Sequence, residues 1–259
     1  MLNDILTAFG NCIFVEILKL FKHIAILFAL VLLVLTEVNA QKRKSLNLPE
    51  FDRRRFHFGF IIGCNSAHME LRRDGPASPT DSLHVIAVVP QTGFNLGIVS
   101  SLSLMENLKL RFVPSLSFAQ RNLEYYFKRT DNVWVKEVKP VESTYVEFPL
   151  NLKLKSKRLN NFGAYLIGGA NYSLDLIADE NVDNLNKNRD DIVVKMKKNT
   201  ISLEVGTGVD FYMEYFKFGI ELKMSYTLEN THIQDNTIYS TPIQGLYPRM
   251  FLLSFTFEG

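Results

Sequence analysis

Apolar and polar side chains alternate with a period of two along most of the chain. In residues 216–226 every even position is aromatic or aliphatic, and every odd position is charged, small or hydroxyl-bearing. Residues 200–212 largely follow the same pattern. Because successive side chains of a β-strand point to opposite faces, this period predicts strands with one apolar and one polar face. It predicts six further strands, at residues 56–63, 94–99, 108–118, 145–155, 162–167 and 251–257.

The eight predicted strands are joined by connections of alternating length. Short links lie at residues 105–107, 156–161 and 214–215, and longer polar links at 67–92, 129–140, 175–198 and 229–246. Short turns at one end and long loops at the other are typical of bacterial outer-membrane barrels, in which the turns face the periplasm. We therefore predict an all-β fold, an eight-stranded antiparallel up-and-down transmembrane β-barrel with both termini on the periplasmic side.

The size of the apolar side chains favours a membrane barrel over a soluble one. The chain contains 20 Phe and 10 Tyr, and Phe and Leu occupy the apolar face of nearly every predicted strand, more than a small lumen can hold. The last predicted strand places an aromatic residue, Phe257, close to the C-terminus, similar to the signal read by the outer-membrane assembly machinery. A secreted, lipocalin-like ligand-binding barrel, whose apolar face would point inward, is the alternative.

The N-terminal part of the chain carries the pattern of an export signal. Lys19 and Lys22 precede an apolar run at residues 24–35, and the short residues Val38 and Ala40 follow it. Because the run is too short to span a bilayer comfortably, a cleaved signal peptide is favoured over an anchor, and the mature protein is expected in the cell outer membrane. The predicted domains are a signal peptide (1–40), a basic periplasmic segment (41–55) and the barrel (56–259).

Charged side chains of both signs lie on the polar face, which would point into the lumen. The predicted lumen charge network consists of Lys109, Arg111, Glu147, Lys153, Glu204, Asp210, Lys217, Glu221, Lys223 and Arg249. Buried charges must pair or stay hydrated, so we expect ion pairs that fill the lumen. An anionic ligand site or conduit is the alternative. Eight strands enclose room for side chains or one small ligand, so a pore for proteins or sugars is not expected.

Composition and motifs argue against nucleic-acid binding and catalysis. The formal net charge is only +2, without the basic footprint of a nucleic-acid-binding protein. The sequence has no glycine-rich phosphate loop, zinc-ligand spacing or nucleophile elbow, and its histidines are scattered. We predict no catalytic, cofactor-binding or metal-binding residues and no small-molecule substrate. A rim-site enzyme would need His, Ser and Asp side chains together at the extracellular end.

Two blocks are more specific than the alternation, ESTYVEFPL at residues 142–150 and KSKRLNNF at residues 155–162. Together with residues 56–60, 93–99, 110–118, 165–169 and 215–219, they resemble the PorT family of Bacteroidetes outer-membrane proteins, called SprT in gliding bacteria. The resemblance implies a role in cargo export through the type IX secretion system, and sometimes in gliding motility. It implies no catalytic residues. The implied partners are outer membrane lipid and other secretion-system proteins.

A narrow barrel has no room for protein cargo, so the hypothesis from the sequence is an accessory or scaffold. It would contact larger machinery through its loops or through the basic N-terminal segment. An OmpA-like structural or adhesive barrel, which binds surfaces through its loops, is the alternative.

Overall fold

In the computed structural model, the described residues are 46–73, 83–128, 133–178, 180, 182–184, 188 and 191–259. The predicted signal peptide and residues 41–45 lie outside them. The strands are β1 (Phe56–Arg73), β2 (Leu83–Ser103), β3 (Leu108–Phe112), β4 (Ser115–Lys128), β5 (Trp134–Lys155), β6 (Phe162–Asp175), β7 (Asn199–Tyr212), β8 (Lys217–Thr227) and β9 (Ile243–Glu258). A short 3-10 helix, η2 (Phe51–Arg53), precedes β1. Within the described ranges, no helix has the length and hydrophobicity needed to cross a membrane.

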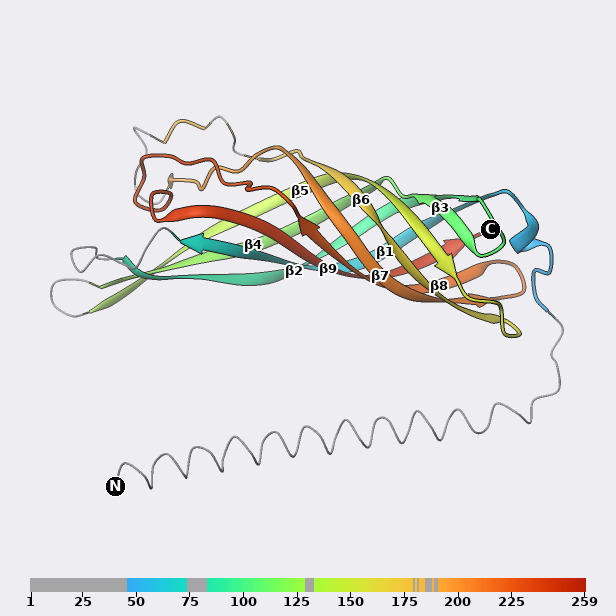
Figure 1. The fold of residues 1–259 in the computed structure, drawn as a ribbon. Coiled ribbons are helices and arrows are strands. Elements are labelled where there is room, and N and C mark those ends of the chain that lie inside the picture. The colour runs from blue at the N-terminus through green and yellow to red at the C-terminus, as the bar shows by residue number, and fades with distance from the viewer. Residues whose placement is uncertain are drawn as a thin grey trace, which may run out of the picture. The chain divides into compact units, whose positions relative to one another are not determined.

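The strands close into one antiparallel ring (Figure 1). β1 pairs with β2 on one side and with β9 on the other, so the first and last strands seal the ring. β3 and β4 both lie between β2 and β5 and are separated only by Val113 and Pro114. Since proline has no N–H to donate to the ladder, the two segments are one barrel strand with a break. The ring therefore has eight strands, which confirms the predicted fold class.

The apolar face of the strands points outward. Large apolar side chains that are 44–61% exposed include Phe58, Phe60, Leu96, Leu150, Leu152, Leu166, Leu203, Leu222 and Leu253. Neighbouring rings stack on this surface, as Phe60 does on Phe257 with centroids 4.8 Å apart. A soluble barrel would bury these side chains, so the lipocalin-like alternative is wrong. We call this outer surface the apolar band, and it matches the lipid-facing band of outer-membrane barrels.

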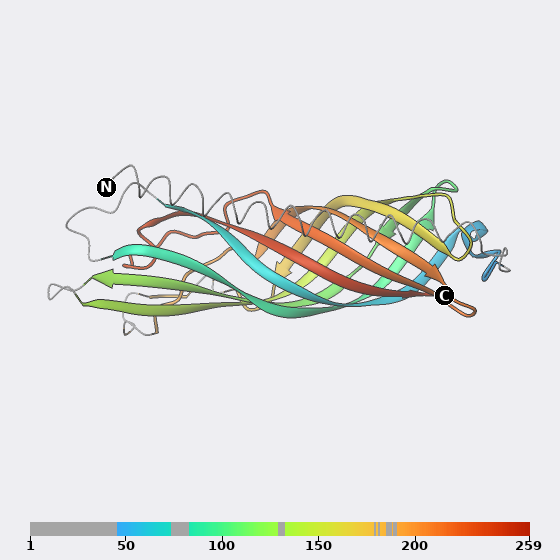
Figure 2. The same ribbon diagram turned by 90° about the horizontal axis from the view of Figure 1, so that it is seen from below.

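Several strands continue far beyond the apolar band, at the end opposite the short turns (Figure 2). β1 ends at Arg73, and β2 and β5 begin at Leu83 and Trp134. Most of residues 67–92 and 129–140 is therefore strand, and the prediction that these are loops is wrong.

In β1, β4 and β5 the pairing is continuous through the extension, but inward side chains such as Met69, Leu123 and Val141 are apolar, which reverses the pattern of the apolar band. In β2 the pairing with β4 also shifts register between Pro90 and Phe94. A bulge reverses which side chains point inward, so no single parity runs along β2. The predicted loop between β6 and β7 is present, while the one after β8 is shortened by the start of β9 at Ile243.

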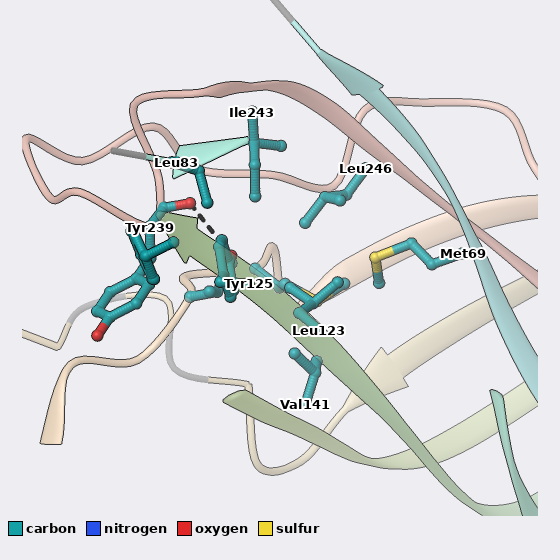
Figure 3. Close-up of a cluster of buried hydrophobic side chains, with 11 residues drawn as sticks. Met69, Leu83, Leu123, Tyr125, Val141, Tyr239, Ile243 and Leu246 are labelled. Atoms are coloured by element: carbon teal, nitrogen blue, oxygen red, sulfur yellow. Dashed lines mark hydrogen bonds between the residues drawn. The ribbon is translucent and has the colours of Figure 1, made fainter. Parts of the chain in front are cut away.

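The extended strands carry a hydrophobic core of their own (Figure 3). The inner faces of β1, β2, β4 and β5 pack against residues 192–196 and 239–246. The buried members are Met69, Leu83, Leu123, Tyr125, Phe127, Val141, Val194, Met196, Tyr239, Ile243 and Leu246. The Tyr125 hydroxyl donates a hydrogen bond to the Tyr239 carbonyl at 3.1 Å. We call this folded part the head; because short turns face the periplasm, the head faces outside the cell.

Candidate functional site in the barrel lumen

The polar face of the strands lines the lumen and holds most of the predicted charges. Nine of the ten predicted network residues are buried, each no more than 7% exposed: Lys109, Arg111, Glu147, Lys153, Glu204, Asp210, Lys217, Glu221 and Lys223. They come from β3, β5, β7 and β8, whose inward positions recur every second residue.

Arg249 does not belong to this set, and its inward prediction is wrong. It shares the parity of Phe251 and Leu253, so its side chain points outward, where it is 44% exposed. There it pairs with Glu70 of β1. The prediction fails because it assumes that a charged side chain on a strand points inward. This assumption holds only within the apolar band, because outward side chains between the band and the head meet lipid headgroups and water.

The centre of the network is a chain of ion pairs across the lumen. Arg111 lies 2.5 Å from Glu221 and 3.8 Å from Glu258. Lys217 lies 2.8 Å from Glu258 and 3.6 Å from Asp210. Because β3, β7, β8 and β9 each contribute a charge, these pairs connect opposite walls of the barrel.

Lys153 and Tyr165 complete this layer. The Lys153 ammonium lies 2.9 Å from Asp210 and 3.5 Å from the centroid of the Tyr165 ring. The Tyr165 hydroxyl donates to Glu221 at 2.9 Å.

A second group lies nearer the head. Glu204 lies 2.9 Å from the Lys223 ammonium and accepts a hydrogen bond from the Asn151 amide at 2.7 Å. Glu147 accepts one from the Ser115 hydroxyl at 3.2 Å. A cavity of about 20 Å³ beside this group is lined by residues that include Arg121, Tyr145, Glu147 and Ser202. That volume is enough for about one water molecule, so the lumen is filled at this level.

The segment before β1 folds into the other mouth of the barrel, the one with the short turns. Its Asp52 carboxylate lies 2.7 Å from Lys155 and 3.4 Å from Lys109, and it accepts a hydrogen bond from the Tyr212 hydroxyl at 3.0 Å. Burial raises the pKa of Asp52, but the hydrogen bond and charge of Lys155 and the charge of Lys109 outweigh it and hold this pKa below its ordinary value of 3.8. We call residues 46–55 the plug.

Apolar and backbone contacts hold the rest of the plug. Phe51 is 3% exposed, and its ring centroid lies 4.2 Å from that of His57. The Asn161 side chain accepts a hydrogen bond from the Asn47 backbone N–H at 2.9 Å. Arg158 donates to the Asn47 carbonyl. The predicted basic periplasmic segment, residues 41–55, thus includes a part that is docked in the barrel mouth.

The plug balances the charge of the lumen wall. In the described strands, the buried cations of this region are Lys109, Arg111, Arg121, Lys153, Lys155, Lys217 and Lys223, and the buried carboxylates are Glu147, Asp175, Glu204, Asp210, Glu221 and Glu258. Asp52 supplies the seventh carboxylate. The sequence analysis missed Asp52 and Glu258. Glu258 could have been found, because it follows the outward Phe257 on the same strand and must therefore point inward. Asp52 lies outside the alternating pattern, so no periodic signal could have identified it.

A Ser–His contact lies in the head, where a rim-site enzyme would hold its residues. Ser240 Oγ is 3.0 Å from His232 Nε2, and it also accepts a hydrogen bond from the Asp235 backbone N–H at 2.8 Å. Both side chains are buried, and the Asp235 carboxylate pairs with Lys195 rather than with His232. Among the described residues, the contact thus has no orienting carboxylate, and its hydroxyl is buried. No group of His, Cys, Asp and Glu side chains in the described ranges is arranged to hold a metal ion.

Comparison with known proteins gives the following matches. Residues 39–232 match the family model described as outer membrane protein beta-barrel domain. Similar solved structures include the attachment invasion locus protein Ail of Yersinia pestis, with 12% identity, 80% of this chain and 100% of that chain covered, and a TM-score of 0.36. OprG of Pseudomonas aeruginosa has 14% identity, 79% and 94% coverage and a TM-score of 0.38. Neisserial surface protein A has 13% identity, 77% and 95% coverage and a TM-score of 0.35. No curated protein matches the sequence.

Proposed function

Because the chain belongs to the outer membrane protein β-barrel domain family and lies in the outer membrane, we propose that it is a non-enzymatic accessory or scaffold of a protein-secretion system of the type IX kind. It acts through its head and its N-terminal segment, not as a conduit. Its partners are outer membrane lipid and other secretion-system proteins. In this proposal residues 1–40 are a cleaved signal, residues 41–55 face the periplasm, and the barrel and head begin at residue 56.

The observation that carries the proposal is the filled lumen. Arg111 of β3 pairs with Glu221 and Glu258 on the opposite wall, Lys217 extends this chain to Asp210, and the plug occupies the periplasmic mouth through Asp52. Opening a passage would separate several buried charges, each at a cost of several kcal/mol. The surfaces free to act on other proteins are therefore those at the two ends. The resemblance of residues 142–150 and 155–162 to the PorT family supports a secretion role, including gliding motility where cells glide.

Deletion of the gene tests the proposal. We expect cargo proteins to disappear from the medium and to accumulate in the periplasm, with normal abundance of other outer-membrane proteins. Complementation with the intact chain restores export. A tagged protein extracted in mild detergent should co-purify with other secretion components. Unchanged secretion in the deletion strain contradicts the proposal.

An OmpA-like structural or adhesive role is the second candidate, and the folded head favours it. A buried core at Leu123, Tyr125 and Tyr239 holds residues 192–196 and 239–246 against the extended strands, as a surface-binding protein requires. In that case deletion reduces envelope integrity or adhesion and leaves export intact, and the pull-down recovers no secretion components.

A further inference from the structure

The Arg249 side chain points outward and belongs to a cluster of cationic and aromatic side chains on the outside of the barrel. Arg249 is cross-strand neighbour to His68 of β1 and to Tyr226 of β8. Its guanidinium lies 5.4 Å from the centroid of the Tyr226 ring. Tyr247 lies one row higher, and Arg72, two rows higher on β1, reaches back to it, with the guanidinium 4.5 Å from the centroid of the Tyr247 ring. From these positions we propose that the outer face of β8, β9 and β1 binds the phosphorylated headgroup of a lipid in the outer leaflet.

The height of the cluster matches the headgroup level. Arg249 lies two positions beyond Phe251, the last outward apolar residue of β9, which is about 7 Å along the strand. An arginine on the lipid face costs several kcal/mol at the bilayer centre and about 0–1 kcal/mol at the interface. Arg249 is therefore tolerated where phosphate groups lie, and Tyr226 and Tyr247 are residues typical of that interface.

Glu70 positions the two arginines without neutralising them. It pairs with Arg249 and lies 3.6 Å from Arg72 Nε. Each guanidinium has five N–H donors in a planar fork, of which one carboxylate uses at most two. Two cations and one carboxylate leave a net positive charge, and the side chains of Arg72 and Arg249 are 59% and 44% exposed. Guanidinium groups held in place with free N–H donors are suited to a phosphate, which accepts two parallel hydrogen bonds.

The opposite side of the barrel lacks this arrangement at the same level. There the outward side chains beyond the Phe94–Phe118 stack are Gln120 and Glu142. A similar trio of Lys136, Glu124 and Tyr126 exists on β4 and β5. Lys136 of this trio is eight positions from Thr144, the cross-strand partner of Phe118. The trio therefore lies about 25 Å farther out along the strand than the Phe94–Phe118 stack. The trio is out of reach of headgroups and provides a matched control.

Native mass spectrometry of the full barrel in detergent tests the proposal, with lipid A carrying its phosphates and the same lipid A after phosphatase treatment as probes. We expect the wild type to bind the phosphorylated form roughly tenfold more tightly, the difference expected for a charge-assisted hydrogen bond. The double variant Arg72→Gln/Arg249→Gln should lose this preference. Lys136→Gln should keep it.

Two further measurements make the outcome decisive. Arg249→Lys keeps the charge and loses the planar fork, so it should show a loss of affinity several-fold smaller than that of Arg249→Gln. Folding of every variant is checked by its electrophoretic shift on heating. Equal binding of the two lipid forms by the wild type overturns the proposal, as does equal loss in the Lys136→Gln control. Displacement of the lipid by inorganic phosphate at the same concentration would instead identify a free-phosphate site and likewise overturn it.

Discussion

Asp52 is the one carboxylate that the plug brings to the lysines of the barrel mouth, so Asp52→Asn tests the role of charge in docking. The substitution keeps the shape and an oxygen that accepts from Tyr212. It removes the negative charge that lies 2.7 Å from Lys155 and 3.4 Å from Lys109. These lysine side chains are only 5% and 2% exposed. They would therefore stay buried without a counter-charge in the docked state.

The expected magnitude follows from that burial. Removing one partner of a fully buried ion pair costs about 3–5 kcal/mol. The Asp52 side chain is 23% exposed, and water reaches the mouth, so we expect about 2 kcal/mol for docking of the plug. Because each 1.4 kcal/mol is a factor of ten, the population of undocked plug should rise roughly thirtyfold.

Limited proteolysis with trypsin measures this population. The plug contains Arg54 and Arg55, which become cleavable when it leaves the mouth, and the cleavage rate follows the open population when opening is fast. Rates are normalised to the same bonds in the unfolded chain, since Asp52 lies close to the cleaved bonds. Glu50→Gln is the control. Within the described residues Glu50 pairs with Arg53 at the surface, and the substitution should change the rate less than about threefold. Equal rates for Asp52→Asn and Glu50→Gln would refute the reasoning.

Three further predictions concern pH, the lumen and the head. Since docking lowers the pKa of Asp52 below 3.8, the charge of Asp52 fully stabilises docking above that value, and this stabilisation is lost as the pH falls through the lower docked pKa. Hydrogen-exchange protection of the plug amides, measured relative to the unfolded chain at the same pH, should therefore be the same at pH 7 and 5 and should fall below about pH 4. A loss of protection between pH 7 and 5 would contradict this. Arg111→Met leaves Glu221 and Glu258 with one cation fewer. The free energy of unfolding of the barrel, measured by urea titration, should therefore fall by about 3 kcal/mol. An unchanged urea midpoint would show that the pairs contribute nothing. Leu123→Ala opens a cavity in the head core at a cost of about 2–4 kcal/mol. Proteolysis of residues 228–242 should accelerate, while the urea midpoint of the barrel stays equal to that of the wild type. A matching loss of barrel stability would mean that head and barrel unfold together.

Periodicity predicted the part of the fold that lies in the membrane, for a physical reason. Within lipid, an outward polar side chain is costly, so the alternation in residues 216–226 reports directly which face is outside. The same reasoning located Lys153, Asp210 and Lys217 on the inner face. Outside lipid the constraint disappears. The sequence therefore misplaced Arg249.

Two other features depend on contacts that no local pattern records. The strands of the head were missed because their inner face is apolar, as at Met69 and Leu123, and because the bulge between Pro90 and Phe94 breaks the alternation of β2. The contacts of Asp52 join the short segment before β1 to residues more than 50 positions away, such as Lys109 and Tyr212. Such contacts arise from the closed ring, and the sequence around Asp52 carries no sign of them.

The plug also sets an order of assembly. Residues 46–55 precede every strand in the chain, yet their docking partners Lys109, Lys155 and Tyr212 lie on β3, β5 and β7. The mouth that receives Phe51 is complete only when β9 pairs with β1. The part of the barrel unit that is synthesised first therefore cannot complete its native contacts before β3, β5 and β7 are in place.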